Sequence, residues 1–130
     1  MGFNYLRDNS GNFAPVLKTI PADSETSYKS GDALVVTGGK ATKATGTTKP
    51  EYICATTGEG LEEVAAIQVT PTQEYRTEFS ADASAVAIGA KVTIGTSADN
   101  VTATTTNGVA EIITKYGTGE AGTDVVVRFS

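Results

Sequence analysis

The fold of this chain is decided by the stretch GDALVVTGGKATKAT, residues 31–45, which indicates two short strands around a pair of glycines. Val and Thr recur on both sides, and their β-branched side chains fit a pleated strand better than a helix. Gly38-Gly39 separates the two runs and can adopt the positive φ that a tight hairpin needs. The stretch therefore predicts a β-hairpin.

The same order of elements returns in the second half of the chain. Gly31 matches Gly89, and Leu34 matches Val92. Side chains that point inward in the first copy therefore match side chains that point inward in the second. Because the elements recur in the same order, we favour two tandem pseudo-repeats, 15–70 and 71–130, over chance similarity between two stretches rich in Ala, Thr and Gly. The matched strands are 16–20 with 74–79, 31–36 with 89–94, 40–45 with 100–104, 52–55 with 109–113, and 64–69 with 125–129.

Composition sets the size and character of the core. The 130 residues are 39% hydrophobic and 7% aromatic, with no Trp, so the core must be built from small side chains. Half-length units of five short strands would be marginal alone, and we expect the two repeats to share one core. The prediction is one all-β domain, residues 15–130, forming a small barrel or sandwich of about ten short strands, preceded by an N-terminal arm, residues 1–14.

Charge and hydropathy exclude several classes of partner. Ten Lys and Arg against fifteen Asp and Glu give a formal net charge of −5, and the basic residues are scattered. A nucleic-acid partner is not expected, because binders of phosphate backbones cluster their basic residues. No run approaches the ~18 apolar residues of a membrane span. The first eight residues lack the basic and apolar regions of a signal peptide, so we expect synthesis in the cytoplasm and no membrane partner.

The residues that most often carry catalysis are scarce. The chain has no His, which removes the usual Ser-His-Asp, Cys-His and histidine-metal arrangements. Its single cysteine, Cys54, stands in an apolar run and is expected to be a buried small hydrophobe. We therefore predict a protein that is not an enzyme and uses no cofactor or metal.

Three weaker motifs do not change that prediction. Glu62 and Glu63 are adjacent, and adjacent strand residues point to opposite faces, so they would not form a catalytic carboxylate pair. The glycines of residues 117–122 join two β-runs, whereas a phosphate loop opens a helix. No Asp-x-Asp spacing supports calcium binding by Asp82, Asp99 or Asp124.

Residues 1–14 stand outside the repeats. Asn9-Ser10-Gly11-Asn12 indicates a flexible joint, yet Phe3, Tyr5, Leu6 and Phe13 flank it, and disordered tails usually lack such aromatics. The segment is either an arm that packs onto a neighbouring subunit or partner, or an extra edge strand on its own domain. Deletion of residues 1–12 distinguishes the two roles. If the segment is an arm, its loss should weaken binding to the partner and leave the fold intact, whereas loss of an integral strand should destroy the fold.

The hairpin stretch and its second copy resemble the core of tailed-bacteriophage head decoration proteins. In that family a Gly-[Asp/Glu]-Ala strand leads into a Gly-Lys-containing hairpin and a further strand, as in residues 31–45 and 49–53 here. Residues 79–82, 89–92, 101–104 and 108–111 resemble the same pattern, so the likeness covers about residues 13–130.

This resemblance implies a function in binding. Decoration proteins attach to the outside of the assembled capsid, often as trimers, and reinforce it against the pressure of the packaged DNA. The implied partner is the major capsid protein, the implied location is the virion exterior, and a homotrimer is favoured. By position alone, the candidate contacts with the capsid or a neighbouring subunit are Phe3, Tyr5, Leu6, Arg7 and Phe13.

An adhesin is the alternative function. A virion- or cell-surface binding module could recognise a glycan or protein through Thr-rich loops such as residues 104–107. The low aromatic content argues against it, because sugar rings are usually held by stacking on aromatic side chains.

Overall fold

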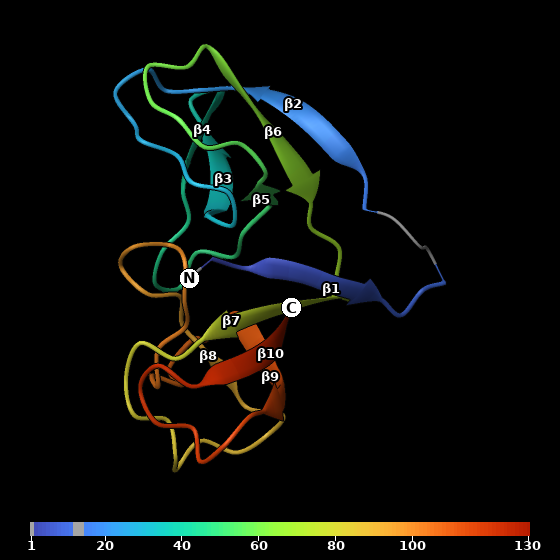
Figure 1. The fold of residues 1–130 in the computed structure, drawn as a ribbon, viewed down its shortest axis with the longest axis vertical. Helices are drawn as coiled ribbons and strands as arrows, with labels where there is room; N and C mark the ends of the chain where they lie inside the picture. Colours follow the sequence, from blue (N-terminus) through green and yellow to red (C-terminus); the bar gives the residue numbers. More distant parts are fainter. Residues whose placement is uncertain (1, 12–14) are drawn as a thin grey trace.

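The structure, a computed structural model, describes residues 2–11 and 15–130, and these contain strands and turns but no helix. Ten strands form two antiparallel sheets of five strands each, stacked along the long axis of the molecule (Figure 1). Neither sheet closes into a barrel, so the all-β prediction is confirmed in its sandwich form. The strands are β1 (Asn4–Asp8), β2 (Leu17–Pro21), β3 (Ala33–Thr37), β4 (Lys40–Lys43), β5 (Tyr52–Cys54), β6 (Glu63–Gln68), β7 (Gln73–Glu78), β8 (Lys91–Val92), β9 (Ala110–Lys115) and β10 (Asp124–Phe129).

The two sheets share one strand order. The first runs β2-β6-β5-β3-β4, and the second runs β7-β10-β9-β8 with β1 added outside β7. Val101 takes the place of β4 in the second half, because it forms an antiparallel bridge to Ile94 much as β4 pairs antiparallel with β3. Parallel bridges close the same corner of each half, Ala22 with Ala41 in the first and Phe79 with Val101 in the second. This shared topology is what tandem duplication of one unit would produce.

The hairpin predicted at Gly38-Gly39 is confirmed. β3 and β4 pair antiparallel around it, with Thr37 opposite Lys40. The two glycines have φ values of 60° and 77°, which suit a residue without a Cβ atom.

The second glycine turn, at Asn107-Gly108, differs from the hairpin that its sequence predicts. Asn107 has a positive φ of 54°, but β9, which follows the turn, pairs with β8 and β10 and not with the segment before the turn. Gly108 is required for a different reason: a Cβ atom there would lie 2.1 Å from the carbonyl oxygen of Lys91. The glycine therefore allows the chain to cross close over β8.

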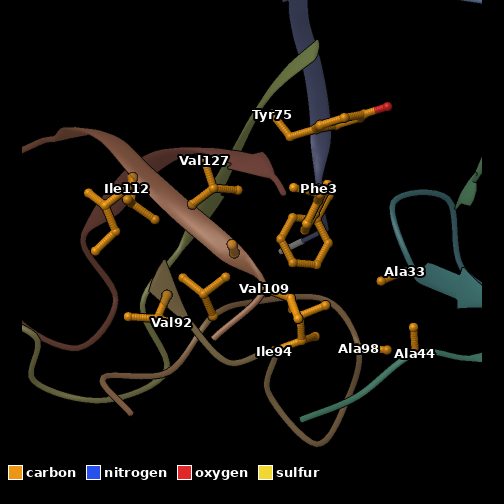
Figure 2. Packing of buried hydrophobic residues seen from close by; sticks show 14 of the residues in the cluster. Phe3, Ala33, Ala44, Tyr75, Val92, Ile94, Ala98, Val109, Ile112 and Val127 are labelled. Carbon is orange, nitrogen blue, oxygen red and sulfur yellow. The ribbon is translucent and has the colours of Figure 1, made fainter. Parts of the chain in front are cut away.

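Two clusters of buried side chains form the core. The smaller one lies in the first half and includes Tyr28, Leu34 and Val64. The larger one centres on the second sheet but draws residues from both halves and from the start of the chain (Figure 2). Its members are Phe3, Ala33, Ala44, Ile53, Tyr75, Phe79, Ala83, Val92, Ile94, Ala98, Val101, Val109, Ala110, Ile112, Val125, Val127 and Phe129.

Small residues and main-chain hydrogen bonds join the two halves. Ala33 and Ala44 of the first half lie beside Ala98 of the second (Figure 2), and the Ala33 amide donates to the Ala98 carbonyl at 2.7 Å. Gly46 and Ile94 exchange two main-chain hydrogen bonds, each 2.9 Å long. Such close approach of the main chains explains why the junction uses Ala and Gly where other cores place larger side chains.

Candidate functional site

The five side chains predicted to contact a partner fall into different environments. Phe3 is only 1% exposed and packs in the larger core cluster. Tyr5 is half-buried against the same cluster, Leu6 is exposed, and the Arg7 side chain is 59% exposed. Phe13 lies outside the described residues. Among the four described candidates, Leu6 and Arg7 thus offer the accessible surface.

Residues 4–8 form an edge strand on the second sheet. β1 pairs antiparallel with β7, with Asn4 opposite Arg76 and Tyr5 opposite Tyr75. The register shifts between Tyr5 and Arg7, which leaves Leu6 as the extra residue of a bulge. Of the two roles considered for residues 1–14, the described strand has the intramolecular one, with Leu6 directed to the surface.

Polar contacts fix the end of β1 to β7. The Glu74 carboxylate, 4% exposed, accepts hydrogen bonds from the Arg7 guanidinium at 3.1 Å and from the Asn9 side-chain amide. The Thr72 hydroxyl donates to the Asp8 carboxylate at 2.7 Å. A buried carboxylate needs such donors, so this end of β1 is tied to the sheet.

An aromatic group anchors the start of β1. Phe3 meets Phe129 edge-on with ring centroids 5.2 Å apart, and Tyr75 lies 5.5 Å from Phe129 and 5.8 Å from Tyr5. The Tyr75 hydroxyl donates to the Gln73 side chain at 2.8 Å. Burial, with smaller contributions from nearby negative charge, raises the pKa of the Tyr5 and Tyr75 phenols. Both phenols are therefore neutral at physiological pH.

The most accessible apolar surface near the start of the chain lies on and beside β2, the first edge strand of the first sheet. Four of its five residues are exposed, and only Ile20 is buried. Leu17 is 61% exposed and the preceding Val16 58% exposed. Lys18 is the only charged residue between Asn9 and Ala22 in a chain with a net charge of −5. The segment is thus apolar, and its one charge is opposite in sign to the net charge of the chain.

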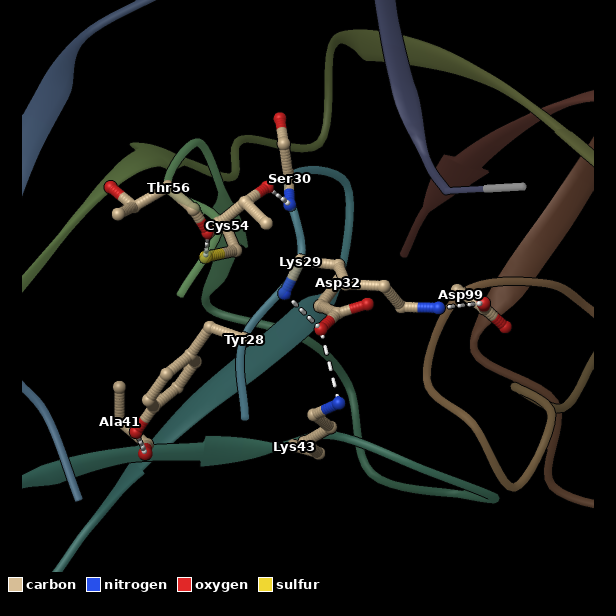
Figure 3. Close-up of polar contacts among 10 residues, drawn as sticks. Tyr28, Lys29, Ser30, Asp32, Ala41, Lys43, Cys54, Thr56 and Asp99 are labelled. Carbon is tan, nitrogen blue, oxygen red and sulfur yellow. Dashed lines mark hydrogen bonds and ion pairs between the residues drawn. The ribbon is translucent and has the colours of Figure 1, made fainter. Parts of the chain in front are cut away.

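A second polar group lies at the junction of the halves (Figure 3). The buried Asp32 carboxylate accepts from the Lys29 amide at 2.9 Å and pairs with the Lys43 ammonium at 3.1 Å. The Lys29 ammonium reaches across to Asp99 of the second half at 3.5 Å. A small pocket of about 140 Å³ lies between Asp32 and Asp99, and one oxygen of Asp32 has no hydrogen-bond partner.

This pocket is electrically balanced. Asp32 and Asp99 each have an ammonium group beside them, so a divalent cation would find no net negative charge to neutralise. Asp82 and Asp124 lie in other contacts, with the Ser84 amide and with Arg76 respectively. The hydrogen bonds from Ser84 lower the pKa of Asp82. Within residues 2–11 and 15–130, no three His, Cys, Asp or Glu side chains form a group suited to a metal ion.

Cys54 is buried, as its apolar surroundings predict. Its Sγ–H donates to the Thr56 carbonyl at 3.1 Å. Burial raises the pKa of the thiol despite the opposing effects of Thr56 and Lys43. A buried thiol that holds its proton is a poor nucleophile, so Cys54 has a packing role.

A shallow groove of about 360 Å³ lies beside β5 and β6. Its one acidic lining residue, Glu51, already accepts the Val36 amide at 2.8 Å. The groove offers contact area but no arrangement of acid, base and nucleophile. Its lining residues are Lys49, Pro50, Glu51, Tyr52, Gln68 and Val69.

Comparisons with known proteins do not extend these observations. No family model, curated protein or solved structure matches the chain. In the described part of the chain, no helix is long and apolar enough to cross a membrane.

Sequence reasoning missed the exposed edge of β2. The pattern of residues 16–20 predicts a strand but does not indicate a binding role for it. The available signal was the pair Pro15 and Pro21, because proline is confined to the edges of sheets and both ends of this strand carry one.

Proposed function

We propose that this chain is a non-enzymatic structural protein that binds the outer surface of a bacteriophage capsid and stabilises the head. The observation that carries the proposal is the exposure of three apolar side chains near the start of the chain. Leu6, Val16 and Leu17 are exposed on or beside two strands that each stand at the edge of a sheet. Exposed apolar side chains on unpaired edges are features of protein-binding surfaces.

The resemblance of residues 31–45 and of their second copy to decoration proteins supports the same function. A protein that binds only the assembled shell stabilises that state, because disassembly must first break the added contacts. The duplicated sandwich is suited to this task, since the shared core joins the halves and holds both edge strands in fixed positions.

The proposal assigns different tasks to the predicted contact residues. Leu6 and Arg7 remain candidates for contact, and Val16 and Leu17 join them because of their exposure. Phe3 instead positions β1 from the core. The proposed partner is the major capsid protein, and the proposed location is the virion exterior after synthesis in the host cytoplasm. The favoured assembly is a homotrimer, and sedimentation equilibrium would measure its mass.

Co-sedimentation tests the proposal. Expanded heads assembled from the major capsid protein of the same genome, but lacking this chain, should pellet with purified protein in a saturable manner. Leu17→Ser should weaken the binding, whereas Ile88→Ser should not, although Ile88 is equally exposed at 64%. Wild-type protein that stays in the supernatant with such heads would overturn the proposal.

A further inference from the structure

The two pseudo-repeats differ at one edge. In the second sheet, β1 covers the outer side of β7. β2 is the counterpart of β7, because Ala22 and Phe79, the residues just beyond the two strands, form matching parallel bridges. No described strand lies on the outer side of β2 over residues 17–19. Among the described strands, the first sheet therefore has no counterpart of β1.

The main-chain groups of β2 are oriented to accept such a strand. Hydrogen bonds from Gln68 to Val16 and from Ala22 to Glu62 show that even-numbered residues bond to β6. In an antiparallel pair these residues alternate with residues that face away, so the N–H and C=O of Leu17 and Thr19 point to the outer side. We call these two residues the open edge.

The groups that correspond to the open edge in the second half are already paired. Counting back from the matched bridges, Leu17 corresponds to Glu74 and Thr19 to Arg76. Glu74 stands opposite Arg7, and Arg76 stands opposite Asn4, in the β1–β7 ladder. In both strands, therefore, the corresponding residues direct their main-chain groups away from the rest of the sheet. Of the two strands, only β7 has a described strand, β1, paired with these groups.

We propose that the open edge binds one extended strand of the major capsid protein, antiparallel to β2, with a carboxylate opposite Lys18. This inference rests on the proposed function and names the contact through which it acts. Main-chain hydrogen bonds would supply affinity, and the apolar side chains of Val16 and Leu17 would supply additional contact area.

Charge favours a partner strand over a second copy of this chain. Two copies that pair through Leu17 and Thr19 in a symmetric antiparallel register would place Lys18 opposite Lys18 of the copy. Like charges directly opposite each other destabilise a ladder, whereas a carboxylate opposite Lys18 stabilises it. Pro15 and Pro21 further limit pairing, because neither has an N–H to donate, so the edge offers donors at only two positions.

A pair of variants at Thr19 isolates the outer main-chain donor. Thr19→Pro removes an N–H that is not used in the ladder with β6, and Thr19→Val keeps it. In co-sedimentation with the heads described above, Thr19→Pro should bind roughly tenfold more weakly, as loss of one hydrogen bond with an acceptor left unpaired predicts. Thr19→Val should bind like the wild type.

A second pair tests the charge without altering the main chain. Lys18→Glu should weaken binding strongly, because it places two carboxylates opposite each other. Lys40→Glu makes the same change in net charge at the exposed first residue of β4 and should have little effect. This pair keeps the inference testable if Thr19→Pro fails to fold.

Hydrogen exchange of individual amides gives the direct readout. In the free protein the amides of Leu17 and Thr19 should exchange rapidly, whereas those of Lys18 and Ile20 should be protected by β6. Head-bound protein should protect Leu17 and Thr19 as well.

The outcomes separate this inference from the proposed function. If the wild type does not bind heads, both are overturned. If heads bind Thr19→Pro and Lys18→Glu as well as wild type, or if Leu17 and Thr19 still exchange rapidly on heads, only the open-edge contact is overturned. Self-association of the wild type that Thr19→Pro abolishes would identify a second copy as the occupant and overturn it too.

Discussion

Gly31 and Gly89 hold equivalent positions in the two halves, with φ values of +99° and +95°, but their surroundings differ. A Cβ atom on Gly31 would lie 2.8 Å from the Cα of Gly2, whereas one on Gly89 would meet no atom within 4 Å. Only the first glycine therefore carries a packing requirement in addition to its backbone conformation.

Alanine at each glycine separates the two requirements. Both Gly31→Ala and Gly89→Ala should destabilise the protein, because alanine is strained at positive φ. Gly31→Ala should cost about 1–3 kcal/mol more, the usual penalty for overpacking a tight contact. Urea unfolding measures the difference, and equal losses would contradict the close Gly2–Gly31 contact.

Two lysines near the junction should differ in their importance. Lys43→Met leaves the buried Asp32 carboxylate without its counter-charge and should cost about 3 kcal/mol. Lys29→Met breaks an ion pair whose lysine side chain is 63% exposed and should cost less than about 1 kcal/mol. Similar unfolding free energies for the two variants would show that Asp32 does not depend on Lys43.

Tyr75 should make the protein sensitive to alkali. Because its pKa is raised in the folded state, the folded protein holds this proton more tightly than the unfolded chain. Its stabilising contribution is fully present below about pH 10 and declines above that pH, by up to about 1.4 kcal/mol per pH unit. Urea midpoints from pH 8 to 11 should therefore fall less steeply in Tyr75→Phe than in the wild type; identical slopes would contradict this.

At the level of secondary-structure elements, β1 is part of the folded core as well as an edge strand. Phe3, which directly precedes β1, packs in the larger cluster, whereas Leu6 within β1 is exposed. Phe3→Ala should cost about 3–5 kcal/mol, and Leu6→Ala less than about 0.5 kcal/mol. Deletion of residues 2–8 should abolish the β circular dichroism signal, and a truncated protein that keeps its fold would show that β1 is dispensable.

Local sequence patterns predicted most elements but not their edges. Residues 31–45 specify their hairpin through β-branched runs and a glycine pair, both of which act within a few residues. The hairpin that Asn107-Gly108 predicts is wrong, because this glycine is required by its close approach to Lys91, a residue on a different strand. The burial of Phe3 was likewise unpredictable, since it depends on Phe129 at the other end of the chain.

At the scale of the whole molecule, the two halves share one strand order, are joined by a common core cluster, and differ in that β1 is added to the second sheet. The larger core cluster contains residues of both halves, whereas the smaller cluster lies within the first half. The order of the matched strands can be predicted from the sequence, because inward- and outward-facing side chains alternate within each strand. The candidate site can be predicted only in part from the sequence, because the open edge depends on where β1 lies, and among the described strands it lies beside β7 and not beside β2.

The most direct test of the proposed function is electron cryomicroscopy of heads assembled from the major capsid protein of the same genome, with and without this chain. The account predicts additional ordered density at fixed positions on the outer surface, into which the two sheets fit with β2 facing the shell. Heads that show no additional density at saturating protein concentration would contradict it.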